Sequence, residues 1–238
     1  MFFKTFFFTL FSTYLLAGSP NYSFADVSVN YLDWTSKTEK ESPQKDFSYL
    51  EVEGGIGYDW GDFYMFVDIE NPTKGYKDDE PYNLRIAFKP VLDIKLGNSA
   101  FYYHLQDYSL IMDTFYTHEI INAIAYKYST QGFWIKPFLG LMYKNSTYYT
   151  GFGGYTFGLN FAYDFSLFQE NFTLALWHEN NFLRNKNDYD KSGYQGALSI
   201  WYKLIDEVTL GLQYRYADIN LGYSGYQDGI IYSLKYNF

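Results

Sequence analysis

The chain ends in the stretch Ile230–Phe238, IIYSLKYNF, in which large apolar side chains alternate with smaller or polar ones. Successive side chains of a β-strand point to opposite faces, so a period of two gives this segment one apolar and one polar face. Chain ends are commonly frayed and polar in soluble domains. We therefore expect the apolar face of this last strand to pack against a partner surface, either a protein core or lipid.

The same alternation recurs along most of the chain. It is clearest in residues 63–70, 84–89, 155–164 and 208–216. A tilted strand needs about 9 to 11 residues to cross a bilayer, and the strands expected around these segments reach that length. The pattern predicts an all-β protein, a 12-stranded antiparallel transmembrane β-barrel formed by residues 26–238. The expected strands lie near residues 27–35, 47–57, 62–70, 82–90, 99–112, 117–128, 132–144, 150–164, 170–183, 193–203, 207–218 and 228–238.

The lengths of the connections give the expected orientation of this barrel. Outer-membrane barrels have short periplasmic turns and longer outer loops, and an even number of strands places both termini on the periplasmic side. If the first strand runs outward, the short connections 58–61, 129–131 and 204–206 all fall on the periplasmic side. The longer, polar connections 36–46, 71–81, 184–192 and 219–227 then all fall outside.

The composition favours a barrel in lipid over a soluble β-sandwich, which is the main structural alternative. Aromatic residues make up 24% of the chain, with 28 Tyr and 23 Phe, yet the mean hydropathy is −0.29. A sandwich would have to fit a ring-rich face into a core about 10 Å thick. Lipid contact and aromatic girdles at the two membrane interfaces account for these rings more simply.

The first 25 residues resemble a secretory signal peptide. Lys4 precedes an apolar run that is shorter than the roughly 20 residues of a membrane-spanning helix. Ser23 and Ala25 are small residues at the positions that a signal peptidase reads, so cleavage is expected before Asp26. A single anchoring transmembrane helix is the alternative for this segment.

Charge and cysteine content exclude several classes of function. The net charge of −9 becomes −10 when Lys4 is removed with the signal peptide, which argues against a nucleic-acid partner. The sequence has no cysteine, so it can form neither disulfides nor thiolate metal sites. We expect no metal and no cofactor.

The inward faces of the expected strands carry the candidate functional residues. A barrel of twelve strands lies between the eight-stranded barrels that side chains can fill and the 16- to 18-stranded porins with wide channels. Charges of both signs beside aromatic rings suit a planar polar solute, although the same side chains could simply fill the lumen. The candidate substrate-binding residues are Tyr49, Glu51, Glu53, Tyr64, Phe66, Asp68, Glu70, Arg85, Lys89, Trp177, Trp201 and Arg215.

Two neighbouring stretches carry a resemblance to a known family. These are YLEVEGGIGYDWGDFYMFVDIEN (residues 49–71) and LRIAFKPVLDI (residues 84–94). The region 47–96 resembles the nucleoside-specific channel-forming outer-membrane proteins, the Tsx-like porins, with a Tyr-Leu-Glu-x-Glu strand, an aromatic strand containing Tyr64 and Asp68, and a strand ending at Pro90. The resemblance implies a twelve-stranded monomer with a narrow pore that passes nucleosides. One departure is Val91, where members often carry arginine.

The sequence therefore predicts an outer-membrane channel for passive, substrate-selective diffusion of nucleosides or similar planar polar solutes. A general small-solute porin is the closest alternative. An outer-membrane enzyme of the lipase or protease type is a more distant one, with His104 and His118 expected near the outer ends of their strands and His178 in mid-strand. No nucleophile motif accompanies these histidines, so no catalytic residue is assigned.

A channel of this class has an expected location and expected partners. They are the lipid of a Gram-negative outer membrane and the barrel-assembly machinery, which recognises a C-terminal strand ending in an aromatic residue such as Phe238. The outer loops are the segments that a phage or bacteriocin would contact, and a receptor role for them is left open.

Overall fold

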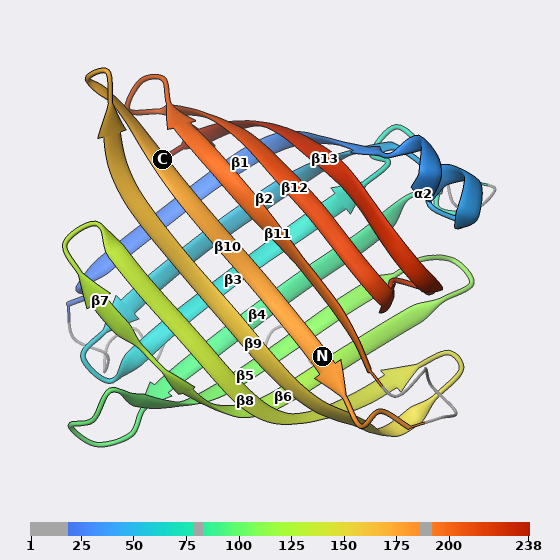
Figure 1. Cartoon of the computed structure of the whole chain (residues 1–238), viewed down its shortest axis with the longest axis horizontal. Helices are drawn as coiled ribbons and strands as arrows, with labels where there is room; N and C mark the ends of the chain where they lie inside the picture. The colour runs from blue at the N-terminus through green and yellow to red at the C-terminus, as the bar shows by residue number, and fades with distance from the viewer. Residues whose placement is uncertain (1–18, 79–82, 186–191) are drawn as a thin grey trace, which may run out of the picture.

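The computed structural model describes residues 19–78, 83–185 and 192–238, and its strands form one closed sheet (Figure 1). Hydrogen bonding joins each strand to an antiparallel neighbour, and the pairing of β1 with β13 closes the ring. The elements are β1 (Tyr22–Trp34), α2 (Ser36–Glu41), β2 (Phe47–Tyr58), β3 (Gly61–Glu70), β4 (Arg85–Lys95), β5 (Phe101–Ile111), β6 (Tyr116–Tyr126), β7 (Tyr128–Thr130), β8 (Phe133–Ser146), β9 (Thr150–Leu167), β10 (Glu170–Phe182), β11 (Ser192–Lys203), β12 (Val208–Asn220) and β13 (Tyr223–Asn237).

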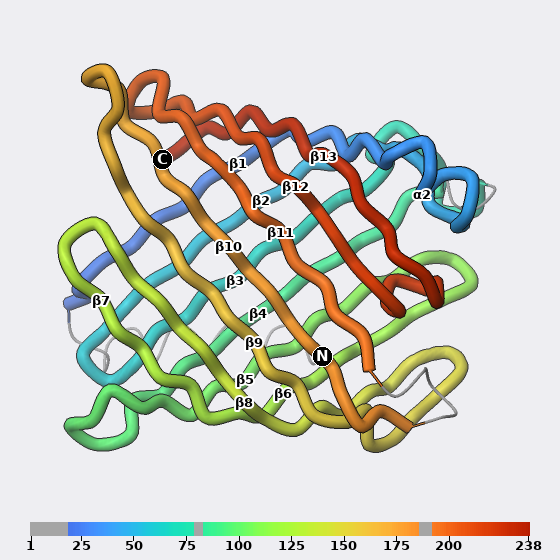
Figure 2. Tube along the Cα trace, in the orientation of Figure 1, coloured from blue at the N-terminus to red at the C-terminus, as the bar shows by residue number. Residues whose placement is uncertain are grey.

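The barrel has twelve strands in its wall and one short extra strand, so the predicted fold is confirmed. β7 has only three residues and pairs with β8 at the end of the strand, while β6 pairs with β8 along the main wall. The strands run obliquely to the long axis of the molecule, which is the tilt that a closed barrel requires (Figure 2).

The two ends of the barrel differ as the sequence predicts, with one exception. One end, on the left in Figure 1, holds Phe238 and short connections such as residues 59–60 and 168–169; we call it the terminus end. The opposite end, the loop end, holds the connection 35–46, helix α2 and the described residues 71–78 and 83–84; the rest of the expected loop 71–81 and residues 186–191 of the expected loop 184–192 lie outside the described residues. The expected outer loop 219–227 is wrong, because β12 and β13 continue to a tight turn at Leu221 and Gly222. Gly222 has a φ of 81°, which suits glycine in such a turn.

Strand β4 differs from its predicted bounds. It was expected to end at Pro90, but it continues to Lys95 with Pro90 in its middle. Proline has no N–H to donate to a ladder. The pairing with β5 is accordingly interrupted between the pairs Phe88–Ser109 and Val91–Gln106, and it resumes beyond them in the same register.

The N-terminal boundary of the barrel stays a prediction. Residues 1–18 of the expected signal peptide lie outside the described residues. β1 begins at Tyr22, four residues before the expected cleavage point, and the segment 22–25 pairs with β2. The part of β1 that begins at Asp26 pairs with β13 as far as Trp34 and with β2 as far as Leu32.

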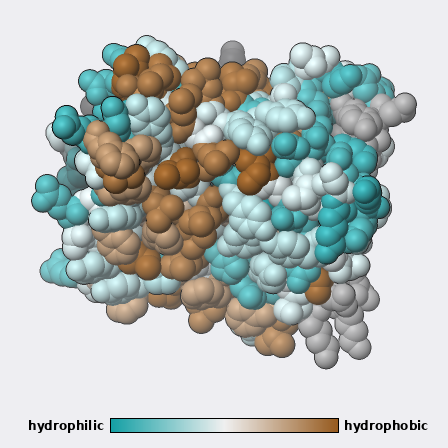
Figure 3. All heavy atoms as spheres, turned by 45° about the horizontal axis from the view of Figure 1, so that its top comes forward, coloured by the Kyte–Doolittle hydropathy of each residue, from teal (hydrophilic) through white to brown (hydrophobic). Residues whose placement is uncertain are grey.

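The outer surface of the barrel is apolar over its middle and aromatic towards its rims. Figure 3 shows apolar side chains gathered over the middle of one face, with hydrophilic residues towards the loop end. Near the terminus end, Tyr163, Phe165, Phe172 and Tyr202 stack in a row across β9, β10 and β11, with ring centroids 5.2 to 5.8 Å apart. Rings at this level are typical of the interfacial girdles of outer-membrane barrels. Among the described residues, no helix is long and apolar enough to cross a membrane.

The interior of the barrel is filled largely by side chains. Two small apolar clusters line it, one on β6 and β8 around Phe138 and Met142, the other on β1, β2 and β13. Phe138 lies against the backbone of Gly158 on β9, where a Cβ would fall 1.9 Å from the ring. Between these clusters the interior is polar, and many of its side chains are buried.

Candidate functional site in the lumen

Five carboxylates line one side of the lumen, on the neighbouring strands β1, β2 and β3. We call Asp26, Glu51, Glu53, Asp68 and Glu70 the acidic wall. Strand register places Asp26 opposite Glu53, and Glu51 opposite Asp68. Directly opposed like charges repel each other and destabilise a sheet, so an arrangement of this kind is more typical of a binding surface than of a stabilising one.

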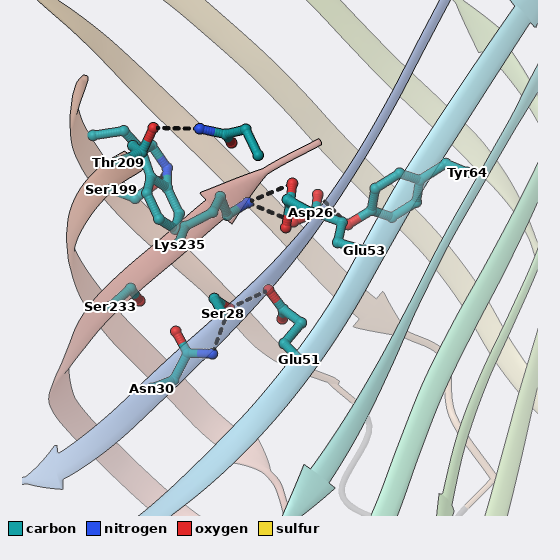
Figure 4. Close-up of polar contacts among 12 residues, drawn as sticks. Asp26, Ser28, Asn30, Glu51, Glu53, Tyr64, Ser199, Thr209, Ser233 and Lys235 are labelled. Carbon is teal, nitrogen blue, oxygen red and sulfur yellow. Dashed lines mark hydrogen bonds and ion pairs between the residues drawn. The ribbon is translucent and has the colours of Figure 1, made fainter. Parts of the chain in front are cut away.

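Two cations neutralise part of the acidic wall. Lys235 on β13 points between Asp26 and Glu53, with Nζ at 3.1 and 2.8 Å from their carboxylates (Figure 4). Arg85 on β4 forms an ion pair with Glu70 at 2.7 Å. Five acids against these two cations leave the wall negative.

The carboxylate of Glu51 lies beside a row of polar groups on β1. Ser28 donates a hydrogen bond to it at 3.4 Å, and Asn30 in turn donates to Ser28 at 2.7 Å (Figure 4). On the other side, the Tyr64 hydroxyl donates to Glu53 at 3.0 Å. Tyr64 and Phe66 meet edge to face, with centroids 6.5 Å apart. The wall thus combines acceptors, hydroxyls and aromatic edges on one surface.

A second group of polar side chains bridges the lumen from wall to wall. Lys89 on β4 forms a 2.7 Å ion pair with Glu179 on β10, two strands that lie far apart around the barrel. Gln106 on β5 donates to the same carboxylate at 2.8 Å, and Arg215 donates to Gln195 at 2.9 Å. We call these five residues the central bridge. A solute must pass beside it or displace it.

The two tryptophans of the candidate site are covered by cations. Lys89 Nζ lies 5.3 Å from the ring centroid of Trp177, and Arg215 Cζ lies 4.5 Å from it. Trp201 rests against Gly211, and Lys235 Nζ lies 4.7 Å from its centroid. Such contacts stabilise the cations over the rings. A flat solute can stack on Trp201 only where Lys235 moves aside.

The structure therefore divides the twelve predicted residues into three groups. Tyr49 faces inward and is buried in the apolar cluster with Leu32, Trp34 and Ile231, on the same strand as Glu51 and Glu53. The other eleven are distributed between the surroundings of the acidic wall and those of the central bridge. The acidic wall and its surroundings hold Glu51, Glu53, Tyr64, Phe66, Asp68, Glu70, Arg85 and Trp201. The central bridge and its surroundings hold Lys89, Trp177 and Arg215.

Several residues of the site were absent from the predicted set. Glu179 and Lys235 anchor the two groups, and Asp26, Ser28 and Asn30 supply the first strand of the acidic wall. The alternation of these last three with Val27 and Val29 is visible in the sequence and would have found them. Alternation also places Glu179 and Lys235 on the inward face, but it does not show which residues they meet across the lumen.

His118 lies near the loop end of β6 and His178 in the middle of β10, as expected, but His104 is placed differently. His104 lies near the terminus end of β5, not the outer end, and it faces the lumen, where its Nδ1 lies 2.6 Å from Asp93. Lys136 binds the other oxygen of the same carboxylate, so His104 belongs to a buried ion network. His118 and His178 face outward, and His178 contacts the Tyr216 hydroxyl at 3.0 Å.

A closed antiparallel barrel with an apolar exterior and a charged interior defines a class, the channel-type β-barrels of bacterial outer membranes. The family model of the nucleoside-specific channel-forming protein, Tsx, matches residues 29–238. The chain belongs to this family. It is accordingly an outer-membrane protein with a porin-like barrel that forms a channel for nucleosides.

Solved structures with a similar fold are distant in sequence. One, from a study of in-meso crystallization of membrane proteins, is 12% identical, with a TM-score of 0.48, and the match covers 90% of this chain and 83% of that one. OmpF of Salmonella typhi, in complex with daunomycin, is 9% identical with a TM-score of 0.39 over 92% of this chain and 100% of its own. The outer-membrane channel DcaP of Acinetobacter baumannii is 11% identical with a TM-score of 0.35, covering 91% and 96%.

Proposed function

We propose that nucleosides cross this channel passively and that the acidic wall holds the ribose on the way. The oxygens of a carboxyl group accept hydrogen bonds, and ribose hydroxyls can donate them. Glu51 and Asp68 lie opposite each other, so one sugar could donate to both. The observation that carries the proposal is this pair of facing carboxylates, which neither Lys235 nor Arg85 binds directly.

The base would meet aromatic edges and amide groups. Tyr64 and Phe66 stand beside the acidic wall, and Gln106 and Gln195 supply amides at the central bridge. Amide groups can both donate to and accept from the edge of a base. A nucleoside would contact the acidic wall and then the central bridge. These groups provide several weak binding sites in series, which a selective channel needs so that its solute can leave again.

Uptake into liposomes tests this function. Liposomes containing the purified barrel are expected to take up adenosine about ten-fold faster than a disaccharide of similar size, at concentrations well below saturation of the site. Protein-free liposomes give the leak rate for both solutes. Equal rates for the two solutes would make the protein a general small-solute porin and would contradict selective binding in the lumen.

Delivery to the membrane is proposed to use the last strand. Phe238 is 82% exposed, and its backbone N–H donates to the Ala25 carbonyl at 3.0 Å. Its ring meets Tyr236 edge to face at 5.2 Å. An exposed aromatic end at the closing seam supports recognition of this strand by the barrel-assembly machinery.

A further inference from the structure

The first residues of β1 lie upstream of the cleavage point that the sequence predicts. β1 begins at Tyr22, and this part of the strand lies at the terminus end of the barrel (Figure 1). A signal peptidase that cuts before Asp26 would remove residues 22–25 from the mature protein. The contacts of residues 22–25 with the rest of the barrel therefore bear on where the cut is made.

The backbone of this segment belongs to the barrel wall. Residues 22–25 pair with residues 54–57 of β2, in the same register as the rest of β1. The pairing of β1 with β13 begins only at Asp26, so among the described strands no other covers this edge of β2. Without residues 22–25 the backbone of residues 54–57 would be unpaired on one side. Barrels close so that no such edge is left.

The seam that closes the barrel also uses the segment. The Phe238 N–H donates to the Ala25 carbonyl at 3.0 Å, and the Asn21 N–H donates to the Gly57 carbonyl at 2.7 Å. A cut before Asp26 would remove both hydrogen bonds, because it removes the Ala25 carbonyl and the Asn21 N–H. The last residue of the chain is thus held by a residue that the predicted cut would take away.

Two glycines of β2 leave room for rings of the segment. A Cβ at Gly57 would fall 2.0 Å from the Tyr22 ring, and a Cβ at Gly55 would fall 2.5 Å from the Phe24 ring. Glycine has no side chain to pack and weakens a strand, and an aromatic ring packed over it restores the contact. In a chain that starts at Asp26 both glycines would lose these rings.

Tyr22 also joins a charged pair at the terminus end of the lumen. It lies on the same face of β1 as Asp26, so it points into the lumen. Its hydroxyl donates to Asp62 of β3 at 2.8 Å, and Lys127 forms an ion pair with the same carboxylate at 2.7 Å. Lys127 Nζ lies 5.8 Å from the centroid of the Tyr22 ring. Since Lys127 follows β6, this contact reaches from one part of the wall to another across the opening.

We propose that the signal peptidase cuts upstream of Asn21, so that the mature protein keeps residues 21–25 and Tyr22 forms part of the channel opening at the terminus end. The step is the hydrolysis of one peptide bond. One water molecule is consumed, the leader gains a carboxyl group, and the mature chain gains an amino group. This proposal does not depend on which solute the channel carries.

The sequence contains small residues for the earlier cut. Ala17, Gly18 and Ser19 directly follow the apolar run of the leader and have the size that a signal peptidase reads. Ser23 and Ala25 have that size as well, but in the folded barrel they lie on the outer face of β1, opposite to Asp26. Their small side chains are therefore compatible with a place in the strand and do not by themselves locate the cut.

Labelling of a single cysteine tests the proposal. The chain has no cysteine, so Ser23→Cys gives the mature protein a thiol only if residue 23 is kept. Cysteine is small, and S23C therefore leaves either cut possible. Val29→Cys is the matched control, because Val29 also lies on the outer face of β1 and is downstream of both cuts. Protein purified from the outer membrane and unfolded in urea is expected to react with a maleimide as completely in S23C as in V29C.

Both outcomes of the labelling decide the position of the cut. S23C protein that takes up no maleimide, or less than half as much as V29C, would overturn the proposal. The intact mass of the wild-type mature chain gives the cut directly. A chain that starts at or before Asn21 supports the proposal, and a chain that starts after Asn21 would overturn it.

Ala25→Leu separates the two cuts without reference to folding. The residue before the cut must be small, so A25L would leave the precursor uncut if the peptidase acted before Asp26. Ala25 is exposed on the outer face, and leucine fits there in the finished barrel. We expect A25L to be processed to the same first residue as the wild type. Accumulation of uncleaved A25L precursor would contradict the proposal.

Tyr22→Ala tests the place of this residue in the opening. Single-channel conductance in a planar bilayer should rise, because the ring that contacts Asp62 and Lys127 no longer stands in the path of ions. Tyr126→Ala is the control, since Tyr126 ends β6 at the same end and its neighbour Ala125 is the residue that faces inward. It should leave the conductance unchanged. A Y22A channel that conducts like the wild type would overturn the role of Tyr22 in the opening.

Discussion

Replacing Glu51 by glutamine and Asp68 by asparagine together is expected to weaken the block of channel current by adenosine by about 10- to 100-fold. A hydrogen bond to a charged acceptor contributes about 1.5 to 3 kcal/mol, and each 1.4 kcal/mol corresponds to ten-fold in affinity. The two carboxylates lie opposite each other in the strand register, and both substitutions keep the shape of the side chain. Titration of adenosine against the current through single channels measures the change.

The double variant should fold normally, because glutamine and asparagine keep the size of the acidic side chains that they replace and still accept hydrogen bonds. Asp206→Asn is the control: this side chain is 89% exposed in a turn at the terminus end, where it pairs with Lys203. It should leave adenosine block unchanged. An E51Q/D68N channel that adenosine blocks as well as it blocks the wild type would remove the acidic wall from the site.

The second large effect is expected at the central bridge. Changing Lys89 and Glu179 together to alanine removes the ion pair that spans the lumen at 2.7 Å, and single-channel conductance should rise severalfold because ions no longer pass beside it. Selection between adenosine and a disaccharide should fall at the same time. Conductance in a planar bilayer and liposome uptake together measure the two effects.

The single variant E179A provides the comparison for the double one. It leaves Lys89 buried without its carboxylate, and breaking a buried ion pair on one side costs about 3 to 5 kcal/mol. We expect E179A to lower the urea midpoint of unfolding more than K89A/E179A does. If the double variant conducts no more than the wild type, the bridge does not restrict the pore.

Most of the fold could be predicted because each strand carries its own signal. Alternation of side chains marks a strand and its faces without reference to any other part of the chain. It fails in residues 219–227, which we expected to form an outer loop because they are polar, although β12 and β13 continue to a tight turn there. It also fails at Pro90, which we expected to end a strand. Pro90 lies within β4, at the gap in the pairing of β4 with β5.

The candidate site was only partly predictable for a related reason. Periodicity shows that Lys89 and Glu179 face inward, yet nothing in the sequence pairs two residues that lie 90 positions apart and meet across the lumen. For the same reason, the sequence does not predict that Lys235, which comes from β13, lies over the ring of Trp201. Tyr49 faces inward as predicted, but its neighbours from β1 and β13 bury it in an apolar cluster.

The measurement that tests the account most directly is the current through one purified channel in a planar bilayer while adenosine is added on one side. We expect a steady open current that adenosine reduces in a saturable way, with sucrose at equal concentration having a much smaller effect, because the nucleoside binds groups on the lumen wall during transit. A current that millimolar adenosine leaves unchanged would contradict a nucleoside site in this barrel.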